Sequence, residues 1–196
     1  TDEAAVQAAV DLANDEGTLA IVVNCAGIGN AIKTTGKKGA FPLDAFSKVV
    51  SVNLIGTFNV IRLAATAMSR LDPTDTGERG AIVNMTSVAA FDGQIGQAAY
   101  SASKGGVLSM SRELGVQFAR EGVRVNALCP GPVNTPLLQE LFATDPERAQ
   151  RRLVHVPLGR FAEPAEMANA VLFLASDESS FITASTFLVD GGISGA

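Results

Sequence analysis

Short segments dominated by apolar and β-branched residues recur along the chain, and each ends at a polar or turn-forming residue. Residues 19–23 read Leu-Ala-Ile-Val-Val and stop at Asn24, and residues 81–85 and 123–128 have a similar character. A short apolar run without polar alternation is typical of a strand buried on both faces of a parallel sheet. Because parallel neighbours need a crossover connection, usually a helix, this feature restricts the chain to α/β architectures.

The segments between these strands have the spacing of amphipathic helices. In the helix predicted from Pro42 to about Met68, apolar residues recur every three positions, at Val49, Val52, Ile55 and Phe58. Further helices are predicted over residues 1–14, 100–120 and 164–175, and a last strand over 186–189. Strands that alternate with helices predict a parallel sheet covered on both faces, with residues 1–196 forming one α/β domain.

The remaining segments are predicted to be loops. Residues 27–41 are rich in Gly, Lys and Thr, and residues 72–77 have the chemistry of turns. Residues 133–159 are predicted to be irregular apart from one short helix after Thr144, because residues 144–147 have capping-box spacing with a proline in the first turn.

The composition excludes several functional classes. Charged residues make up 18% of the chain and its net charge of -5 is scattered, whereas a nucleic-acid surface needs a basic stripe. No unbroken apolar run approaches the ~20 residues of a membrane span. Cys25 and Cys129 are too few for a disulfide framework, and His155 is the only histidine, so no metal site is expected. The expected surroundings are the reducing cytoplasm, and the expected partner is a small-molecule substrate.

The candidate chemistry centres on one tyrosine and one lysine. Tyr100 is the only tyrosine, and Lys104 follows it by four residues, which places both side chains on one face of a helix. The phenol has an ordinary pKa of ~10, and a nearby ammonium favours the phenolate, so the pair can exchange a proton closer to neutral pH. The spacing alone is more often an exposed pair without a role.

The surroundings of this pair favour a site. Ligands of parallel sheets bind beyond the carboxyl ends of the strands, and Ser87 ends the preceding strand, where its hydroxyl can meet a substrate oxygen. The small residues 101–103 and 105–106 let another segment or a cofactor come close. Asn53 is a polar residue in an apolar helix, and taken alone it is expected to be a buried amide bonded locally to the backbone.

The order of these motifs resembles the short-chain dehydrogenase/reductase family from residue 24 to residue 192. The motifs are Asn24-Cys25-Ala26-Gly27, Asn53, Ser87, Tyr100-x-x-x-Lys104, Pro130-Gly131 and Asp190-Gly191-Gly192. The resemblance implies a Rossmann-like doubly wound sheet and hydride transfer between NAD(P) and an alcohol or ketone. It implies that Tyr100 is the general acid/base and that Lys104 lowers its pKa. It also implies that Ser87 polarises the substrate oxygen and that Asn53 holds a water of a proton relay.

The same resemblance implies a cofactor site, for NAD or NADP without a preference. The adenosine half would lie along Asn24, Cys25, Ala26 and Gly27. Tyr100 and Lys104 would reach the nicotinamide ribose, and Val133 and Thr135 would contact the nicotinamide amide. Cys25 would contribute only its backbone, and Cys129 is expected to belong to the core. A homo-oligomer is also implied, a tetramer packed through the long helices and the C-terminal strand.

One family feature is absent from the sequence. Members of the family open with a strand and a Gly-rich turn that holds the pyrophosphate. Residues 27–29 lack the third glycine, which would stand at Ile32, and residues 35–39 lack the last one. The chain is expected to start after the family's third strand, and the two missing βαβ units would carry the pyrophosphate site. The sheet is therefore expected to have an open edge.

Two regions narrow the substrate class. Residues 33–38 and 88–97 are similar to type-2 3-hydroxyacyl-CoA dehydrogenases, and residues 157–166 to 3-oxoacyl-[acyl-carrier-protein] reductases. A 3-hydroxyacyl or 3-oxoacyl thioester is therefore the expected substrate. Gln94 either faces the substrate or is a plain polar loop residue.

Residues 137–158 are expected to form a lid whose apolar residues cover an acyl chain or pack on the domain or on a neighbouring subunit. Those residues are Leu137, Leu138, Leu141 and Phe142. Two alternatives stay open for the function. One is the same chemistry on a steroid, sugar or other small alcohol, and the other is a non-catalytic protein that keeps the fold without cofactor binding.

Overall fold

A four-stranded parallel sheet forms the centre of the chain, as the strand pattern predicts. The computed structural model describes residues 1–37, 39–144, 147, 151 and 153–195. The strands lie in the order β1-β4-β5-β6. Their bounds are Ile21–Asn24 for β1, Gly80–Met85 for β4, Val123–Pro130 for β5 and Thr186–Val189 for β6. All three pairings are parallel, which puts the carboxyl ends at one edge of the sheet.

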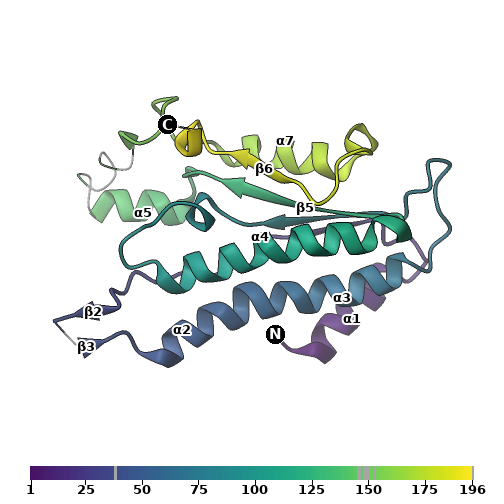
Figure 1. Ribbon diagram of the computed structural model, residues 1–196, viewed down its shortest axis with the longest axis horizontal. Coiled ribbons are helices and arrows are strands. Elements are labelled where there is room, and N and C mark those ends of the chain that lie inside the picture. Colours follow the sequence, from purple (N-terminus) through teal and green to yellow (C-terminus); the bar gives the residue numbers. More distant parts are fainter. Residues whose placement is uncertain (38, 145–146, 148–150, 152, 196) are drawn as a thin grey trace.

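Helices cover the sheet on both faces (Figure 1), which gives the doubly wound arrangement. One face carries α1, a rod made of α2 and α3, and α4, with α3 and α4 both in contact with the strands; α7 packs on the other face. The bounds are Glu3–Ala13 for α1, Leu43–Val50 for α2, Gly56–Met68 for α3, Ala98–Phe118 for α4 and Pro164–Ala175 for α7. At the start of α7, a capping box between Glu163 and Glu166 and a proline at the first turn explain why the helix begins there.

The core is divided between the two faces of the sheet. On the α1–α3–α4 side, fully buried Ile61 and Met68 pack with Ile82 and Val125 of the strands. On the α7 side, Leu174 packs with Val83 and Leu128. Successive strand residues alternate between these two clusters, which explains why the strands are apolar without alternation in sequence.

The sheet has an open edge at β1, as expected. Among the residues that the structure describes, β1 pairs only with β4, and its side chains alternate between half-buried and exposed. Ile21 is 52% exposed and Val23 is 38% exposed, on the same face of the sheet as Val83 and α7.

The helical rod of residues 43–68 is long and apolar. By length and mean hydropathy it is able to cross a membrane, a test that core helices of folded domains also pass. The sequence shows no unbroken apolar run of that length because polar residues such as Asn53 and Arg62 interrupt it. Ile61, Ala64 and Met68 of this rod are fully buried against the rest of the domain.

Two predicted loops contain regular structure. Within residues 27–41, Thr35–Gly36 (β2) and Gly39–Ala40 (β3) form a small antiparallel hairpin. Within residues 133–159, helix α5 spans Pro136–Thr144, where an irregular segment was predicted. The short helix predicted after Thr144 lies largely outside the described residues.

Candidate active site

The predicted site residues gather at the carboxyl edge of the sheet. The N-terminal end of α4 lies beside the ends of the strands in Figure 1. Lys104 Nζ donates a hydrogen bond of 2.7 Å to the carbonyl oxygen of Met85, the last residue of β4. A Cβ at Gly27 would stand 3.5 Å from Lys104 Nζ, and one at Gly29 would stand 3.4 Å from Tyr100 Cδ2. The ends of β1 and β4 and the first turns of α4 therefore meet at one place.

Ser87 and Tyr100 face each other across this place. Ser87 follows β4 and caps the short 3₁₀ helix Val88–Ala90, since its Oγ accepts a hydrogen bond of 3.2 Å from the Ala89 amide. Its hydroxyl also bonds to the half-buried Tyr100, an interaction that lowers the pKa of the phenol. The two hydroxyl groups therefore lie close together, which suits the binding and protonation of one oxygen atom.

The electrostatics of Tyr100 differ from the sequence expectation. Burial raises the pKa of Tyr100 above 10.0, and the Ser87 hydrogen bond lowers it only in part. Lys104, which is 5% exposed, lies 5.7 Å from the centre of the phenol ring and is bonded to the backbone. Burial lowers the pKa of Lys104, and Cys25 and Cys129 raise it to a smaller extent.

Asn53 lies in a π-helical segment, Ser51–Ile55, that joins α2 to α3. Its amide is 1% exposed and holds the backbone of Ile28: Oδ1 accepts from the Ile28 amide and Nδ2 donates to the Ile28 carbonyl, both at 2.8 Å. The expectation of a locally bonded amide is corrected, because the partner is 25 residues away. π-Helical turns are rare and are frequently found at functional sites.

Ser103 was missed as a site residue. It is fully buried, and its Oγ accepts a hydrogen bond of 3.0 Å from Asn53 Nδ2 while donating one of 2.7 Å to the Tyr100 carbonyl. The only sequence signal was its place directly before Lys104, where it was interpreted as a small residue. The small residues do permit close packing: a Cβ at Gly106 would stand 2.9 Å from Leu54 Cδ2.

The predicted adenosine segment leaves the sheet at the end of β1. Asn24 Nδ2 donates a hydrogen bond of 2.8 Å to Asn84 Oδ1 of β4, which fixes the strand end. Cys25, Ala26 and Gly27 are exposed, and Cys25 carries a free thiol.

The segment after β5 passes close to the Asp190 backbone at Gly131. A Cβ at Gly131 would lie 2.8 Å from the Asp190 backbone, so the Pro-Gly and Asp-Gly-Gly motifs are in contact. Val133 forms a bridge with Ala162, and the Thr135 hydroxyl accepts a hydrogen bond of 3.3 Å from the Leu138 amide at the start of α5. Both residues predicted to contact the nicotinamide amide are therefore held in place before α5 begins.

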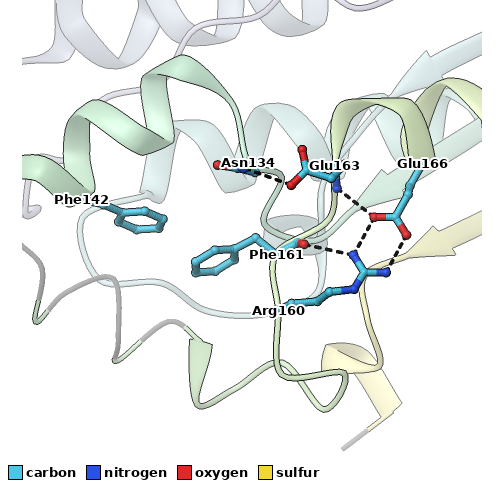
Figure 2. Close-up of a pocket in the computed structure, with 6 residues that line it drawn as sticks. All are labelled: Asn134, Phe142, Arg160, Phe161, Glu163 and Glu166. Atoms are coloured by element: carbon cyan, nitrogen blue, oxygen red, sulfur yellow. Dashed lines mark hydrogen bonds and ion pairs between the residues drawn. The ribbon is translucent and has the colours of Figure 1, made fainter.

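Helix α5 is anchored on its α7 side by aromatic and polar contacts (Figure 2). Phe142 of α5 stacks on Phe161 with ring centres 5.0 Å apart. Asn134 donates a hydrogen bond of 3.0 Å to Glu163. Arg160 and Glu166 form a two-pronged ion pair of 2.7 and 2.8 Å. These residues line an open hollow of about 540 Å³. Of the predicted lid residues, Leu138 is buried and Phe142 packs on Phe161.

Gln94 lies apart from these contacts. Its side chain is exposed, in the loop between the 3₁₀ helix and α4. Among the described residues, no group of three or more His, Cys, Asp or Glu side chains is placed to hold a metal ion.

Comparisons with known proteins agree with this arrangement. A family profile described as enoyl-(acyl carrier protein) reductase matches residues 1–194. The 3-hydroxyacyl-CoA dehydrogenase type-2 of Bos taurus is 45% identical over 198 residues, which cover 98% of this chain and 74% of that protein.

Solved structures give the same result. A putative short-chain dehydrogenase/reductase from Burkholderia xenovorans has a TM-score of 0.89 at 29% identity, covering 100% of this chain and 72% of its own. The 3-hydroxyacyl-CoA dehydrogenase type-2 of Mycobacterium avium has a TM-score of 0.86 at 33% identity, covering 97% and 72%. A putative 2-deoxy-D-gluconate 3-dehydrogenase from Agrobacterium tumefaciens with bound NADP has a TM-score of 0.85 at 29% identity, covering 100% and 75%. The chain belongs to the short-chain dehydrogenase/reductase family, oxidoreductases that use NAD(P) to act on CH–OH groups.

Proposed function

We propose that the protein interconverts a 3-hydroxyacyl thioester and its 3-oxoacyl form, with Tyr100 as the general acid/base. The observation that carries the proposal is the meeting of the Tyr100 and Ser87 hydroxyls beside the buried ammonium of Lys104. The thioester class is supported by the 45% identity to the type-2 3-hydroxyacyl-CoA dehydrogenase of Bos taurus.

In the direction of reduction, Tyr100 donates the phenolic proton to the substrate oxygen. Its raised pKa keeps the phenol protonated at neutral pH, so the acid form is the resting form. Ser87 donates a hydrogen bond to the same oxygen and stabilises the negative charge that develops there. In the direction of oxidation, the phenolate accepts the proton, and a positive charge from Lys104 favours that form.

The residues at the strand ends fit a nicotinamide cofactor. Gly27 has no side chain, and a Cβ there would fill the space 3.4 Å from Asn53 Oδ1 and 3.5 Å from Lys104 Nζ. The Lys104 ammonium has three donors and gives one to Met85, so two are available for ribose hydroxyls. Asn24 to Gly27 would hold the adenosine side, and Val133 and Thr135 the nicotinamide side. When bound, the cofactor would supply or accept the hydride. The choice between NAD and NADP is not fixed by these residues.

The acyl chain would lie under α5, which closes the carboxyl edge of the sheet. Gln94 would face the opposite side of the substrate. Exposed apolar residues on the long helices and on β6 support a tetramer, as the family resemblance implies. These residues are Ile55, Phe58, Val116 and Leu188. Free Cys25 and Cys129 favour a reducing, cytoplasmic location.

A small polyhydroxylated substrate is the second candidate. The Agrobacterium tumefaciens structure that resembles this chain is a putative 2-deoxy-D-gluconate 3-dehydrogenase, so the same fold serves sugar acids.

Oxidation of NADH and NADPH by the purified protein tests the proposal. Acetoacetyl-CoA, acetoacetyl-pantetheine, simple ketones and keto sugar acids would be compared at equal concentrations. We expect the thioesters to have the largest kcat/KM. Turnover of sugar acids without turnover of thioesters would favour the second candidate. Absence of calorimetric binding of either nucleotide would show a non-catalytic family member.

A further inference from the structure

One buried hydroxyl lies between the two halves of the candidate site. Ser103 is fully buried on α4, between Tyr100 and Lys104 in the sequence. Its Oγ donates to the Tyr100 carbonyl at 2.7 Å and accepts from Asn53 Nδ2 at 3.0 Å. It therefore connects the helix that carries Tyr100 to the π-helical segment that carries Asn53.

The directions of these hydrogen bonds are fixed by the groups themselves. The Asn53 amide uses Oδ1 to accept from the Ile28 amide, so Nδ2 must face the Ile28 carbonyl and Ser103. Ser103 accepts from Nδ2, so its single hydrogen goes to the Tyr100 carbonyl. Without the Ser103 oxygen, one N–H of Asn53 would be buried and unpaired.

The chain of bonds ends on the segment that covers Tyr100. Ile28 is held by Asn53 at both its amide and its carbonyl. Its neighbour Gly29 lies against the Tyr100 ring, and its other neighbour Gly27 lies against the Lys104 ammonium. Any movement of Asn53 relative to α4 would move the backbone at both contacts.

We propose that Ser103 is a positioning residue, which acts through Asn53 to hold residues 27–29 over the Tyr100 ring and keep water away from the phenol. The inference rests on the proposed role of Tyr100 as the acid/base. It goes further because it assigns to Ser103 the control of water access to the Tyr100 phenol.

Tyr100 is a direct reporter of this effect, because the chain has one tyrosine and no tryptophan. The near-ultraviolet absorbance of the phenolate and the quenching of tyrosine fluorescence by acrylamide both follow this residue alone. In the Ser103→Ala variant we expect stronger quenching. Because water reaches the ring, the pKa of Tyr100 should fall towards its ordinary value, since burial is what raises it.

Ser111→Ala is the matched control. Ser111 is fully buried on the same helix, donates to the Val107 carbonyl at 2.7 Å and accepts from Asn84 Nδ2 at 2.9 Å. Its loss removes the same two kinds of hydrogen bond at a site that does not touch residues 27–29. We expect a similar loss of thermal stability and an unchanged Tyr100 titration.

Ser103→Cys provides a second variant of nearly the same size, for use if the alanine variant does not fold. A thiol is a weak acceptor, so this variant should change Tyr100 in the same direction. Ser103→Thr keeps the hydroxyl and should restore the wild-type quenching and titration.

The outcome of this test is independent of the substrate. If Ser103→Ala and Ser103→Cys leave quenching and titration at the wild-type values, the positioning role is wrong. If they change Tyr100 while the wild-type protein oxidises neither NADH nor NADPH, the positioning role stands and the proposed function fails. If the wild-type protein turns over the thioester, Ser103→Ala should lower kcat and leave the KM for the thioester nearly unchanged. The pH profile of kcat should shift in the same direction as the phenolate titration.

Discussion

Lys104 and Met85 are joined by a hydrogen bond of 2.7 Å from the buried ammonium to the carbonyl oxygen that ends β4. This bond fixes the first turns of α4 to the carboxyl edge of the sheet. It leaves the ammonium 5.7 Å from the centre of the Tyr100 ring. The lysine therefore has a structural role before any cofactor binds.

Removal of the phenol should abolish most of the activity. Tyr100→Phe keeps the ring against Gly29 but cannot donate or accept the proton, so kcat should fall by ~10²–10⁴-fold. The thermal unfolding curve should stay close to that of the wild type. Steady-state kinetics of acetoacetyl-CoA reduction measures the effect, and a variant that retains turnover would show that another group is the acid.

Ser87 should tune the proton affinity of Tyr100. Because the Ser87 hydrogen bond lowers the pKa of the phenol, Ser87→Ala should raise it further above 10.0. The phenolate absorbance of the single tyrosine measures this directly. A group whose pKa is raised by folding stabilises the folded protein at pH values below the ordinary pKa of that group. This contribution is lost as pH rises through the folded-state value. A fall in the pKa of Tyr100 in this variant would contradict the assigned hydrogen bond.

Two glycines of α4 should respond differently to a methyl group. A Cβ at Gly115 would lie 2.6 Å from the Ala184 amide nitrogen and 2.8 Å from the Val125 carbonyl, both backbone atoms. Gly115→Ala should therefore lower the free energy of unfolding by about 1–3 kcal/mol. Gly105 has nothing within 4 Å, so Gly105→Ala should be neutral or stabilise by up to ~1 kcal/mol through helix propensity. Urea unfolding of the two variants separates these cases, and equal effects would contradict the packing at Gly115.

The buried ion pair at the far end of β5 should matter more than an exposed one. Arg124 binds both oxygens of Glu78 at 3.0 Å, and the two side chains are 7% and 14% exposed. Glu78→Ala leaves a buried cation without its carboxylate and should cost about 3–5 kcal/mol. Glu3→Ala breaks an exposed pair with Arg62 and should cost less than ~1 kcal/mol. Chemical denaturation measures both, and comparable losses would argue against the burial of Arg124.

The Glu166 carboxylate at the start of α7 should titrate at low pH. The Arg160 guanidinium holds the pKa of Glu166 at about 2, with help from the Glu163 amide. Because folding depresses this pKa, its contribution is present above the ordinary value of 4.5 and is lost as pH falls from there through about 2. Arg160→Gln should return the pKa most of the way towards 4.5, as measured by carboxyl NMR. An unchanged pKa would show that the amide alone sets it.

Local patterns in the sequence predicted the sheet and the meeting of Tyr100 with Ser87. Strand burial is visible in short apolar runs, and a four-residue spacing on a helix defines a shared face. The role of Ser103 could not be predicted, since its partner Asn53 lies 50 residues away. Helix α5 was also missed, because the start of the helix depends on the path of residues 131–135 away from the sheet. The hydrogen-bond partner of Asn53 could not be predicted either, because tertiary packing determines it.

The π-helical segment Ser51–Ile55 makes the geometry of the site depend on the number of residues in the rod. A π turn holds one residue more than an α turn, so the two flanking helices are not in the register of one uninterrupted helix. Deletion of a single residue here would leave both flanks helical but rotate α2 by ~100° against α3. Asn53 or its neighbours would then face away from Ile28. Among relatives of this chain, insertions and deletions in the rod should therefore be far rarer than substitutions.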